Sequence, residues 1–278
     1  MASRTVKHLH RAISDDIGDL RTRRPLPNPR VEQVDPFLFL NHHGPQVYPP
    51  HNRGLPFGPH PHRGFETVTF IVEGSLAHRD TGGHESVIHG GGVQWMTAGR
   101  GLEHAELSPE EFLRDGGPLE ILQLWVNLPA RLKMTDPRYV GLQKEEIPSF
   151  TTDGGRVTVN LISGRWDGHD GPVESLTGVT MTTIALEPEG RVSLPVPRGR
   201  NVFLYVVRGE LRTAPELHLV EFNDDGDTVE LEAVQRSLVL FGHAAPFNEP
   251  VVAHGPFVMN TREEIVQAVR DYQAGLFG

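Results

Sequence analysis

The sequence predicts an all-β protein made of two tandem antiparallel β-barrels followed by one helix. Short apolar runs recur along its 278 residues, and most are rich in β-branched or aromatic side chains, which favour strands. Thirty glycines and 23 prolines are dispersed among these runs, as the many turns of an all-β protein require. Residues 69–76 (TFIVEGSL) resemble 204–211 (LYVVRGEL), and this internal similarity indicates two related barrels.

Nine apolar runs are predicted as strands because they are short and bounded by turn residues. They occupy residues 37–40, 66–74, 92–97, 119–128, 157–164, 179–186, 202–211, 229–234 and 236–242. Three prolines interrupt this rhythm between residues 128 and 148. We therefore predict an N-terminal domain at 1–135, a linker at 136–148 and a C-terminal domain at 149–278.

One helix is predicted near the C-terminus. Asn260 or Thr261 can cap it, because a glutamate stands three residues after each of them. Gly275 stands where helices commonly end. The apolar residues at helical spacing are Ile265, Val266, Val269 and Tyr272.

Composition excludes several classes of function. The net charge of −10 argues against general nucleic-acid binding, and the basic cluster Arg21, Arg23 and Arg24 is interpreted as a surface loop. Neither a signal peptide nor a run of about 20 apolar residues is evident, so we expect a soluble cytoplasmic protein that neither crosses nor binds a membrane. Cysteine is absent, so a metal ion must be held by nitrogen and oxygen ligands.

Two short motifs carry the candidate metal chemistry. His60 and His62 are two residues apart, so in an extended chain they point the same way, about 6–7 Å apart at Cα. His104 and Glu106 repeat this spacing after a Gly-rich turn. If both motifs line one barrel interior, three imidazoles and one carboxylate meet there. Such a set suits Fe(II), Mn, Co, Ni, Cu or Zn.

Other candidates are weaker. His8 and His10 are interpreted as surface residues, and the adjacent His42 and His43 cannot both bind one ion because they point to opposite faces. Glu66 shares the parity of His62 but lies about 13 Å away on a regular strand, so we place it outside the ligand set. Three histidines between the motifs either surround the site or belong to surface loops, and the second interpretation is favoured. They are His78, His84 and His89.

Several stretches resemble the pirin family over nearly the whole chain. The matching motifs are PHPHRGFETVTFIVEG (59–74), QWMTAGRGLEHAE (94–106) and GPFVMNTREEIVQAVRDYQAGLFG (255–278). The resemblance implies two tandem cupin barrels with one metal ion in the N-terminal barrel. It also implies that this ion is bound by His60, His62, His104 and Glu106. The C-terminal barrel has SLPVPRGR (193–200) at the position where the first barrel has the histidine pair, so it is expected to bind no metal. Its histidines are scattered along the sequence without paired spacing, at His218, His243 and His254.

The resemblance also implies an activity. It implies a non-haem site of the Fe(II) type. Quercetin 2,3-dioxygenase activity is attributed to bacterial-type pirins. In that reaction dioxygen cleaves the heterocyclic ring of a flavonol with loss of carbon monoxide. Glu106 is then both a ligand and the base that takes the hydroxyl proton. Phe57, Phe65 and Trp95 either shape a slot for the flat substrate or belong to the barrel core.

Two rival interpretations remain from the sequence. In one, the protein is a non-enzymatic regulator whose metal oxidation state controls contact with a protein partner, in keeping with its acidic charge. In the other, it is a metal-stabilised double barrel whose flavonol turnover is incidental. Fe(II) is the favoured metal, with Ni, Mn, Co, Cu or Zn as alternatives, and a monomer is expected.

Overall fold

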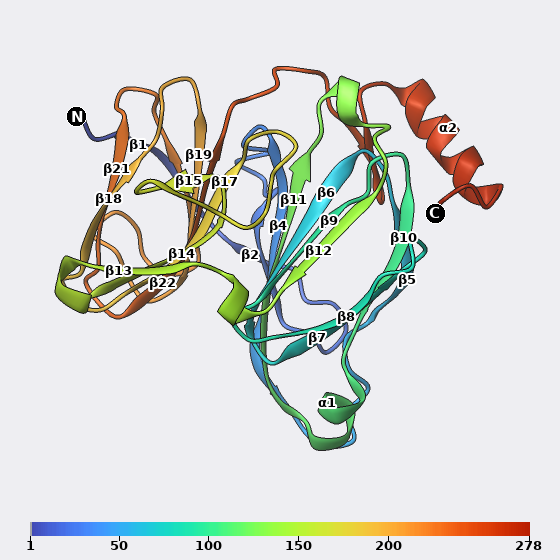
Figure 1. Cartoon of the computed structure of the whole chain (residues 1–278), viewed down its shortest axis with the longest axis horizontal. Helices are drawn as coiled ribbons and strands as arrows, with labels where there is room; N and C mark the ends of the chain where they lie inside the picture. Colours follow the sequence, from blue (N-terminus) through green and yellow to red (C-terminus); the bar gives the residue numbers. More distant parts are fainter. Residues whose placement is uncertain (1) are drawn as a thin grey trace. The chain divides into compact units, whose positions relative to one another are not determined.

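The computed structural model describes residues 2–278 and consists mainly of antiparallel strands, which confirms the all-β prediction (Figure 1). The chain divides into two compact units, each named here after the barrel it contains. The N-barrel comprises Asp15–Thr22, Phe39–Lys144 and Phe247–Gly278. The C-barrel comprises residues 2–14, Arg23–Leu38 and Glu145–Pro246.

These units differ from the predicted domain boundaries at both ends of the chain. Residues 2–14 belong to the C-barrel, and Phe247–Gly278, with the C-terminal helix, belong to the N-barrel. The predicted linker at 136–148 contains β12 (Arg138–Leu142), a strand that pairs with β9 (Val93–Thr97). Its prolines were interpreted as interrupting the strand pattern, but Pro137 directly precedes β12 and Pro148 directly precedes β13 (Ser149–Thr152), so neither removes a hydrogen bond from a strand ladder.

The N-barrel is built from two groups of hydrogen-bonded strands. One has the order β12-β9-β6-β11-β4, and the other β5-β10-β7-β8. Most residues of the following strands lie in this unit: β4 (Phe37–Tyr48), β5 (Phe57–His62), β6 (Phe65–Glu73), β7 (Ser75–Asp80), β8 (Glu85–His89), β9, β10 (Leu102–Leu107), β11 (Gly117–Asn127) and β12. A short helix, α1 (Glu110–Asp115), joins β10 to β11. Short 3-10 turns at Ala130–Leu132 and Lys144–Glu146 precede and follow β12 along the chain.

The interior of the N-barrel differs in polarity along its length. At one end, buried apolar side chains form a core that includes Leu76, Ile88, Ile71 and Ile121. Strand β6 then continues with Thr69 and Thr67 on the face that carries Ile71, because alternate residues share a face. The face of β6 that points into the N-barrel is therefore apolar at one end and carries hydroxyl groups at the other.

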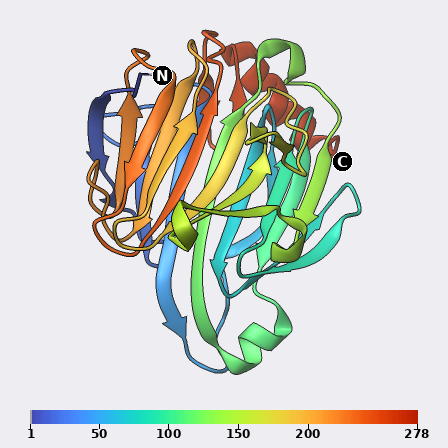
Figure 2. The same cartoon turned by 60° about the vertical axis from the view of Figure 1, so that its left-hand side comes forward.

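The C-barrel has a more uniform apolar core. Its main sheet has the order β1-β20-β19-β22-β17-β14-β13, drawn mostly in yellow and orange in Figure 2. Its core is lined by aliphatic side chains such as Val159, Ile184, Leu204 and Val239. The strands are β1 (Val6–Arg11), β2 (Ile13–Ser14), β3 (Thr22–Leu26), β13 (Ser149–Thr152), β14 (Val157–Ser163), β15 (Arg165–Trp166), β16 (His169–Asp170), β17 (Thr180–Leu186), β18 (Arg191–Pro195), β19 (Asn201–Arg208), β20 (His218–Phe222), β21 (Thr228–Glu232) and β22 (Ser237–Ala244).

The last 32 residues return to the N-barrel as a hairpin and a helix. Strands β23 (Val252–His254) and β24 (Phe257–Met259) pair with each other, and Phe257 bridges to Arg63 after β5. Gly64 follows with φ +88°, and a Cβ there would collide with the Val258 carbonyl, so only glycine lets the hairpin approach this closely.

Helix α2 (Arg262–Gln273) confirms the predicted C-terminal helix (Figure 1). Thr261 caps it, and Glu264 completes the reciprocal capping box. The predicted apolar face is only partly buried, because Val266 is 50% exposed and Tyr272 37% exposed. Among residues 2–278, no helix has the length and apolar character that crossing a membrane requires.

Candidate metal centre

Three histidine side chains meet inside the N-barrel where β5 and β10 pair. His60 lies directly opposite His104 in this antiparallel ladder, and directly opposed residues share one face of a sheet. Their Nε2 atoms are 3.1 Å apart. The ring of His62 lies 5.0 Å from the ring of His104, and one nitrogen of each of the three residues falls within 4.8 Å of the others. This triad can therefore hold a metal ion.

Burial keeps the two inner histidines neutral. Desolvation, reinforced by the neighbouring His60, lowers the pKa of His62 to about 3. Burial also places the pKa of His104 well below its ordinary value, with His62 and His60 adding to the effect. Metal ligation needs the neutral imidazole, so these residues are ready to bind an ion at neutral pH without first releasing a proton.

The hydrogen bonds of the triad also fit a metal ion. His60 Nδ1 lies 2.7 Å from the Gly58 carbonyl, and His62 Nδ1 lies 3.4 Å from the Pro256 carbonyl. A ring that donates from Nδ1 keeps its lone pair at Nε2, the arrangement that metal-ligating histidines adopt. His62 Nε2 is buried and has no hydrogen-bond partner in the described chain, 2–278. A buried nitrogen with a free lone pair facing two other imidazoles is chemically suited to a cation.

Glu106 lies on the same face as His104 but is held by other side chains. One of its carboxylate oxygens accepts a hydrogen bond from the Thr69 hydroxyl at 2.8 Å, and the other accepts from the Gln123 amide at 2.7 Å. Its oxygens do not fall in the tight group formed by the three histidines. A carboxylate has about four lone-pair sites, so these two bonds leave Glu106 able to accept further partners.

Glu66 occupies a different environment from Glu106. It alternates with Thr67 and Thr69 on β6, so it points to the opposite face of the sheet from the one that meets Glu106. Its carboxylate accepts a hydrogen bond from the Thr97 hydroxyl at 2.7 Å, and burial raises its pKa. The Glu66 carboxylate therefore lies on the other side of β6 from the Glu106 carboxylate.

His78 is a site-facing residue that the sequence placed on the surface. It lies on β7 opposite Glu106 in the β7–β10 ladder, is buried, and its ring centroid is 5.4 Å from that of His104. Its Nε2 is 2.9 Å from the Asp80 carboxylate, and Tyr139 stacks on its other side at 4.1 Å. The surface interpretation of His78 was therefore wrong, because the turn that follows β7 starts only at residue 81.

Asp80 contacts two histidines, His78 on the same strand and His84 in the turn that follows it. Although burial acts to raise its pKa, hydrogen bonds from His78 and His84 hold that pKa below the usual value. The ring of His84 is largely exposed, as is His89 at the end of β8, so for these two the surface interpretation holds. Burial raises the pKa of Tyr139 to about 12, so its hydroxyl stays protonated at neutral pH.

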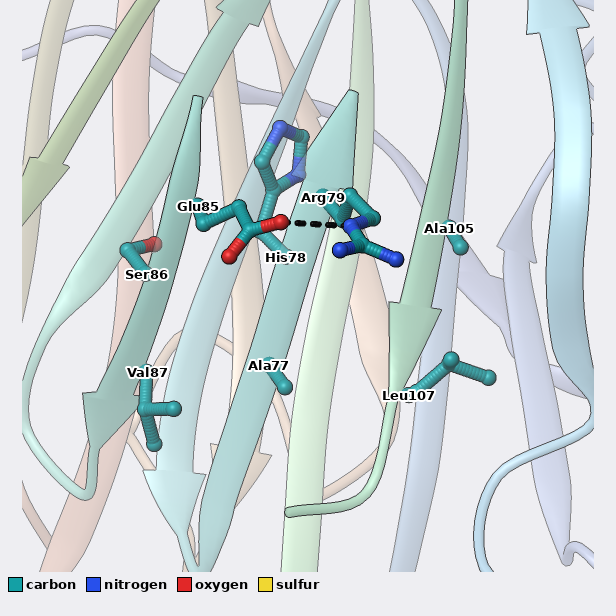
Figure 3. Close-up of a pocket in the computed structure, with 8 residues that line it drawn as sticks. All are labelled: Ala77, His78, Arg79, Glu85, Ser86, Val87, Ala105 and Leu107. Atoms are coloured by element: carbon teal, nitrogen blue, oxygen red, sulfur yellow. Dashed lines mark hydrogen bonds and ion pairs between the residues drawn. The ribbon is translucent and has the colours of Figure 1, made fainter. Parts of the chain in front are cut away.

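The outer surface of the same strands has a different chemistry. Figure 3 shows Ala77 and Arg79 on β7 beside Ala105 and Leu107 on β10, with Arg79 donating to Glu85 at 2.5 Å. These residues alternate with the inward His78, His104 and Glu106. The alternation explains how one strand pair presents small and exposed side chains outside and polar side chains inside.

Aromatic side chains enclose the triad on one side. Phe65 and Trp125 lie 5.0 and 5.4 Å from the ring of His62 and pack on each other. Trp95 alternates with Gln94 on β9 and faces away from the cavity lining, whereas Phe57 packs against His43. Of the three aromatic residues considered in the sequence, Phe65 therefore contacts a triad residue. The contact of Trp125 with the triad was not predicted.

Histidines outside the triad have other partners. His42 lies 2.8 Å from the Glu120 carboxylate and His43 lies 2.9 Å from the Thr22 hydroxyl, in line with their opposite orientations. His10 was predicted on the surface, but it is buried and 2.6 Å from Glu221. That prediction was wrong because β1 joins the edge of a seven-stranded sheet and one of its faces is covered.

His243 in the C-barrel gives a prediction about acid stability. Arg200 Nε donates to its Nδ1 at 2.7 Å, and burial together with Arg200 lowers its pKa to about 3. Below pH 6.5 the unfolded chain binds a proton that the folded chain does not, so stability is lost as pH falls towards 3. We expect His243→Asn, which keeps an acceptor for Arg200, to remove about 3 kcal/mol of the stability loss between pH 7 and pH 4.

Urea unfolding followed between pH 7 and 4 would measure this effect. His89→Asn, at an exposed histidine, should leave the slope of stability against pH unchanged. Equal slopes for wild type and His243→Asn would show that His243 is not the titrating group.

Comparison with known proteins now identifies the family. The pirin family model matches residues 19–126, and the model of the pirin C-terminal cupin domain matches residues 181–278. The chain is 43% identical to a pirin-like protein of Caulobacter vibrioides, with 95% of each chain covered. It is 39% identical to human pirin over 97% of this chain and 91% of the human one. The chain belongs to the pirin family.

Solved structures agree with this membership. A quercetin 2,3-dioxygenase from Acinetobacter baumannii superposes with a TM-score of 0.92 and 30% identity, covering 100% of this pirin-family chain and 99% of that one. A bacterial pirin from Escherichia coli, solved as a nickel(II) complex, shares the fold with a TM-score of 0.67 and 22% identity, covering 86% and 99%. The predicted architecture of two cupin barrels is thereby confirmed.

Several residues around the triad were not found from the sequence. Thr69 and Gln123 lie directly opposite each other on β6 and β11, and Gln94 lies opposite Thr69 on β9. Pro256 reaches His62 from a segment almost 200 residues away in the chain. No local pattern marks them, because their role depends on strand register and on the return of the C-terminal hairpin.

Proposed function

We propose that this pirin-family protein is a metal-dependent dioxygenase that cleaves flavonols such as quercetin with dioxygen. The triad of His60, His62 and His104 carries the proposal, because three imidazoles without thiolates suit a redox-active divalent ion. The similarity to a structure described as quercetin 2,3-dioxygenase supports the substrate class. Fe(II) is the metal we favour, and the nickel(II) complex of the Escherichia coli pirin supports testing nickel as well.

In this proposal Glu106 supplies the fourth ligand and the base. The hydrogen bonds from Thr69 and Gln123 fix its carboxylate beside His104, and its free lone pairs remain available. When bound, the ion would act as a Lewis acid that acidifies a flavonol hydroxyl and would supply the redox chemistry of oxygenation. Glu106 would accept the hydroxyl proton at a carboxylate oxygen, so that the substrate reacts as its anion.

Gln94 is the residue we propose for orienting the substrate. It is 2% exposed and lies on β9 opposite Thr69, on the face that points into the N-barrel. Neither its amide nitrogen nor its amide oxygen has a hydrogen-bond partner within residues 2–278. A buried amide with both groups free can donate to a flavonol carbonyl and accept from a hydroxyl, which would offset the cost of burying it.

The turnover of quercetin tests the proposed activity. Protein loaded with Fe(II), Ni(II), Mn(II) or Co(II) is incubated in air with quercetin, and loss of the flavonol absorbance is followed together with carbon monoxide release. The activity should disappear in His62→Ala and persist in His89→Ala, a variant at an exposed histidine. Absence of turnover with every metal would contradict the dioxygenase proposal and leave the protein-binding regulator as the better explanation.

Gln123→Leu probes the support of Glu106. The substitution leaves one carboxylate oxygen without its donor, so the carboxylate is less well oriented towards the ion. We expect metal affinity to fall by about 10- to 100-fold, as removal of such supporting hydrogen bonds commonly does. Calorimetric titration with Ni(II) measures it, and Gln143→Leu is the matched control. If the Ni(II) affinity of Gln123→Leu equalled that of wild type, Glu106 would not be a ligand whose orientation depends on Gln123.

A further inference from the structure

A groove outside the metal centre lies between β23 and α2 in the N-barrel. Its volume is about 610 Å³, within the range of small-molecule pockets. Its floor is formed by the aliphatic side chains of Val252, Ile265, Val266 and Val269. Val266 is 50% exposed, so part of this apolar surface faces solvent rather than the protein core.

Two arginines stand at the rim of this groove. Arg262 and Arg270 are eight residues apart on α2, with Val266 midway, so all three lie on neighbouring positions of one helix face. Neither guanidinium forms an ion pair with any carboxylate in the described part of the chain, from Ala2 to Gly278. His254 on β23 adds a third polar group to the lining.

The acidic residues of α2 have other partners or lie outside the lining of the groove. Glu264 completes the capping box, and Asp271 pairs with Arg63 at 2.6 Å. Glu263 lies about 20° around the helix from Arg270 but about 10 Å from it along the axis, and it does not line the groove. The groove therefore carries two arginines without an ion-pair partner among residues 2–278, on a chain whose net charge is −10.

We propose that this groove binds a small amphipathic monocarboxylate, meaning an apolar chain or ring with one carboxylate group. The aliphatic floor would bury the apolar part, because removing such surface from water is favourable. Arg262 and Arg270 would pair with the carboxylate in charge-assisted hydrogen bonds, which guanidinium groups form well with planar anions. The groove is distinct from the triad, so this binding does not depend on the dioxygenase proposal.

Titration with decanoate tests the proposal directly. Calorimetry and the methyl NMR signals of the groove valines should show saturable binding of one decanoate per chain, below the concentration at which decanoate forms micelles. Decanol, which has the same chain without the carboxylate, should bind at least about tenfold more weakly, since a charge-assisted hydrogen bond contributes about 1.5–3 kcal/mol.

Variants separate this groove from other sites. The double variant Arg262→Gln/Arg270→Gln should weaken decanoate at least about tenfold, and Val266→Asp should abolish binding, because both act on exposed positions that leave the fold intact. Arg114→Gln, at an exposed helical arginine paired with Asp115, should bind like wild type. Equal binding by wild type and the double variant, or no saturation, would overturn the proposal. Binding only to anionic peptides or vesicles would overturn it too.

Discussion

Replacing His104 with alanine is expected to lower the affinity for Ni(II) or Co(II) by more than about a hundredfold. Loss of a direct ligand should exceed the 10- to 100-fold loss that follows removal of a group supporting a ligand. His104 Nε2 faces His60 at 3.1 Å, so its removal leaves two imidazoles of the triad instead of three. Calorimetric titration of metal-free protein measures the effect.

His89→Ala is the matched control, because it removes an imidazole from an exposed position at the end of β8. The metal-free His104→Ala protein should still fold, since His104 Nδ1 has no hydrogen-bond partner within residues 2–278 and the substitution removes the contact of its Nε2 with His60 Nε2. A melting curve of the metal-free variant checks this point. Metal affinity equal to that of wild type would show that the triad is not the metal site.

Replacing Lys133 with methionine is expected to destabilise the protein by about 3 kcal/mol. The Lys133 amine is buried and donates to the Gly64 carbonyl, the Asn127 side chain and the Val258 carbonyl at 2.8–2.9 Å. Methionine fills a similar volume but leaves three buried acceptors without a donor, each of which carries a desolvation penalty. Burial lowers the pKa of Lys133 to about 8, so the amine is still mostly charged at neutral pH.

Urea unfolding and amide hydrogen exchange measure this effect. Exchange should accelerate most in β24, because the Val258 carbonyl loses the contact that ties the hairpin to the rest of the N-barrel. Lys144→Met, at an exposed lysine in the same unit, should change stability by less than about 0.5 kcal/mol. If the two variants were equally stable, Lys133 would not hold the hairpin in place.

The loss of the hairpin contact also bears on the triad. Pro256 lies between β23 and β24, and its carbonyl is the partner of His62 Nδ1. A buried lysine that no local pattern singles out is thus connected, through one short hairpin, to the orientation of a proposed metal ligand. We therefore expect the Lys133→Met protein to bind Ni(II) more weakly than the Lys144→Met protein.

The sequence by itself determined the all-β class, the capped C-terminal helix and the faces of the two motifs. Strand alternation has a period of two, so His60 with His62, and His104 with Glu106, had to project together whatever the rest of the chain did. The capping box at Thr261 and Glu264 is equally local, since its donors and acceptors lie within one turn.

Only the tertiary structure decided what surrounds those motifs. The register of β5 on β10 brings His60 opposite His104, and the register of β6, β9 and β11 aligns Thr69, Gln94 and Gln123 on one face. The burial of His78 and Lys133 and the return of residues 247–278 to the N-barrel likewise depend on contacts between distant segments. Such contacts depend on the packing of the whole chain, so local sequence patterns do not predict them.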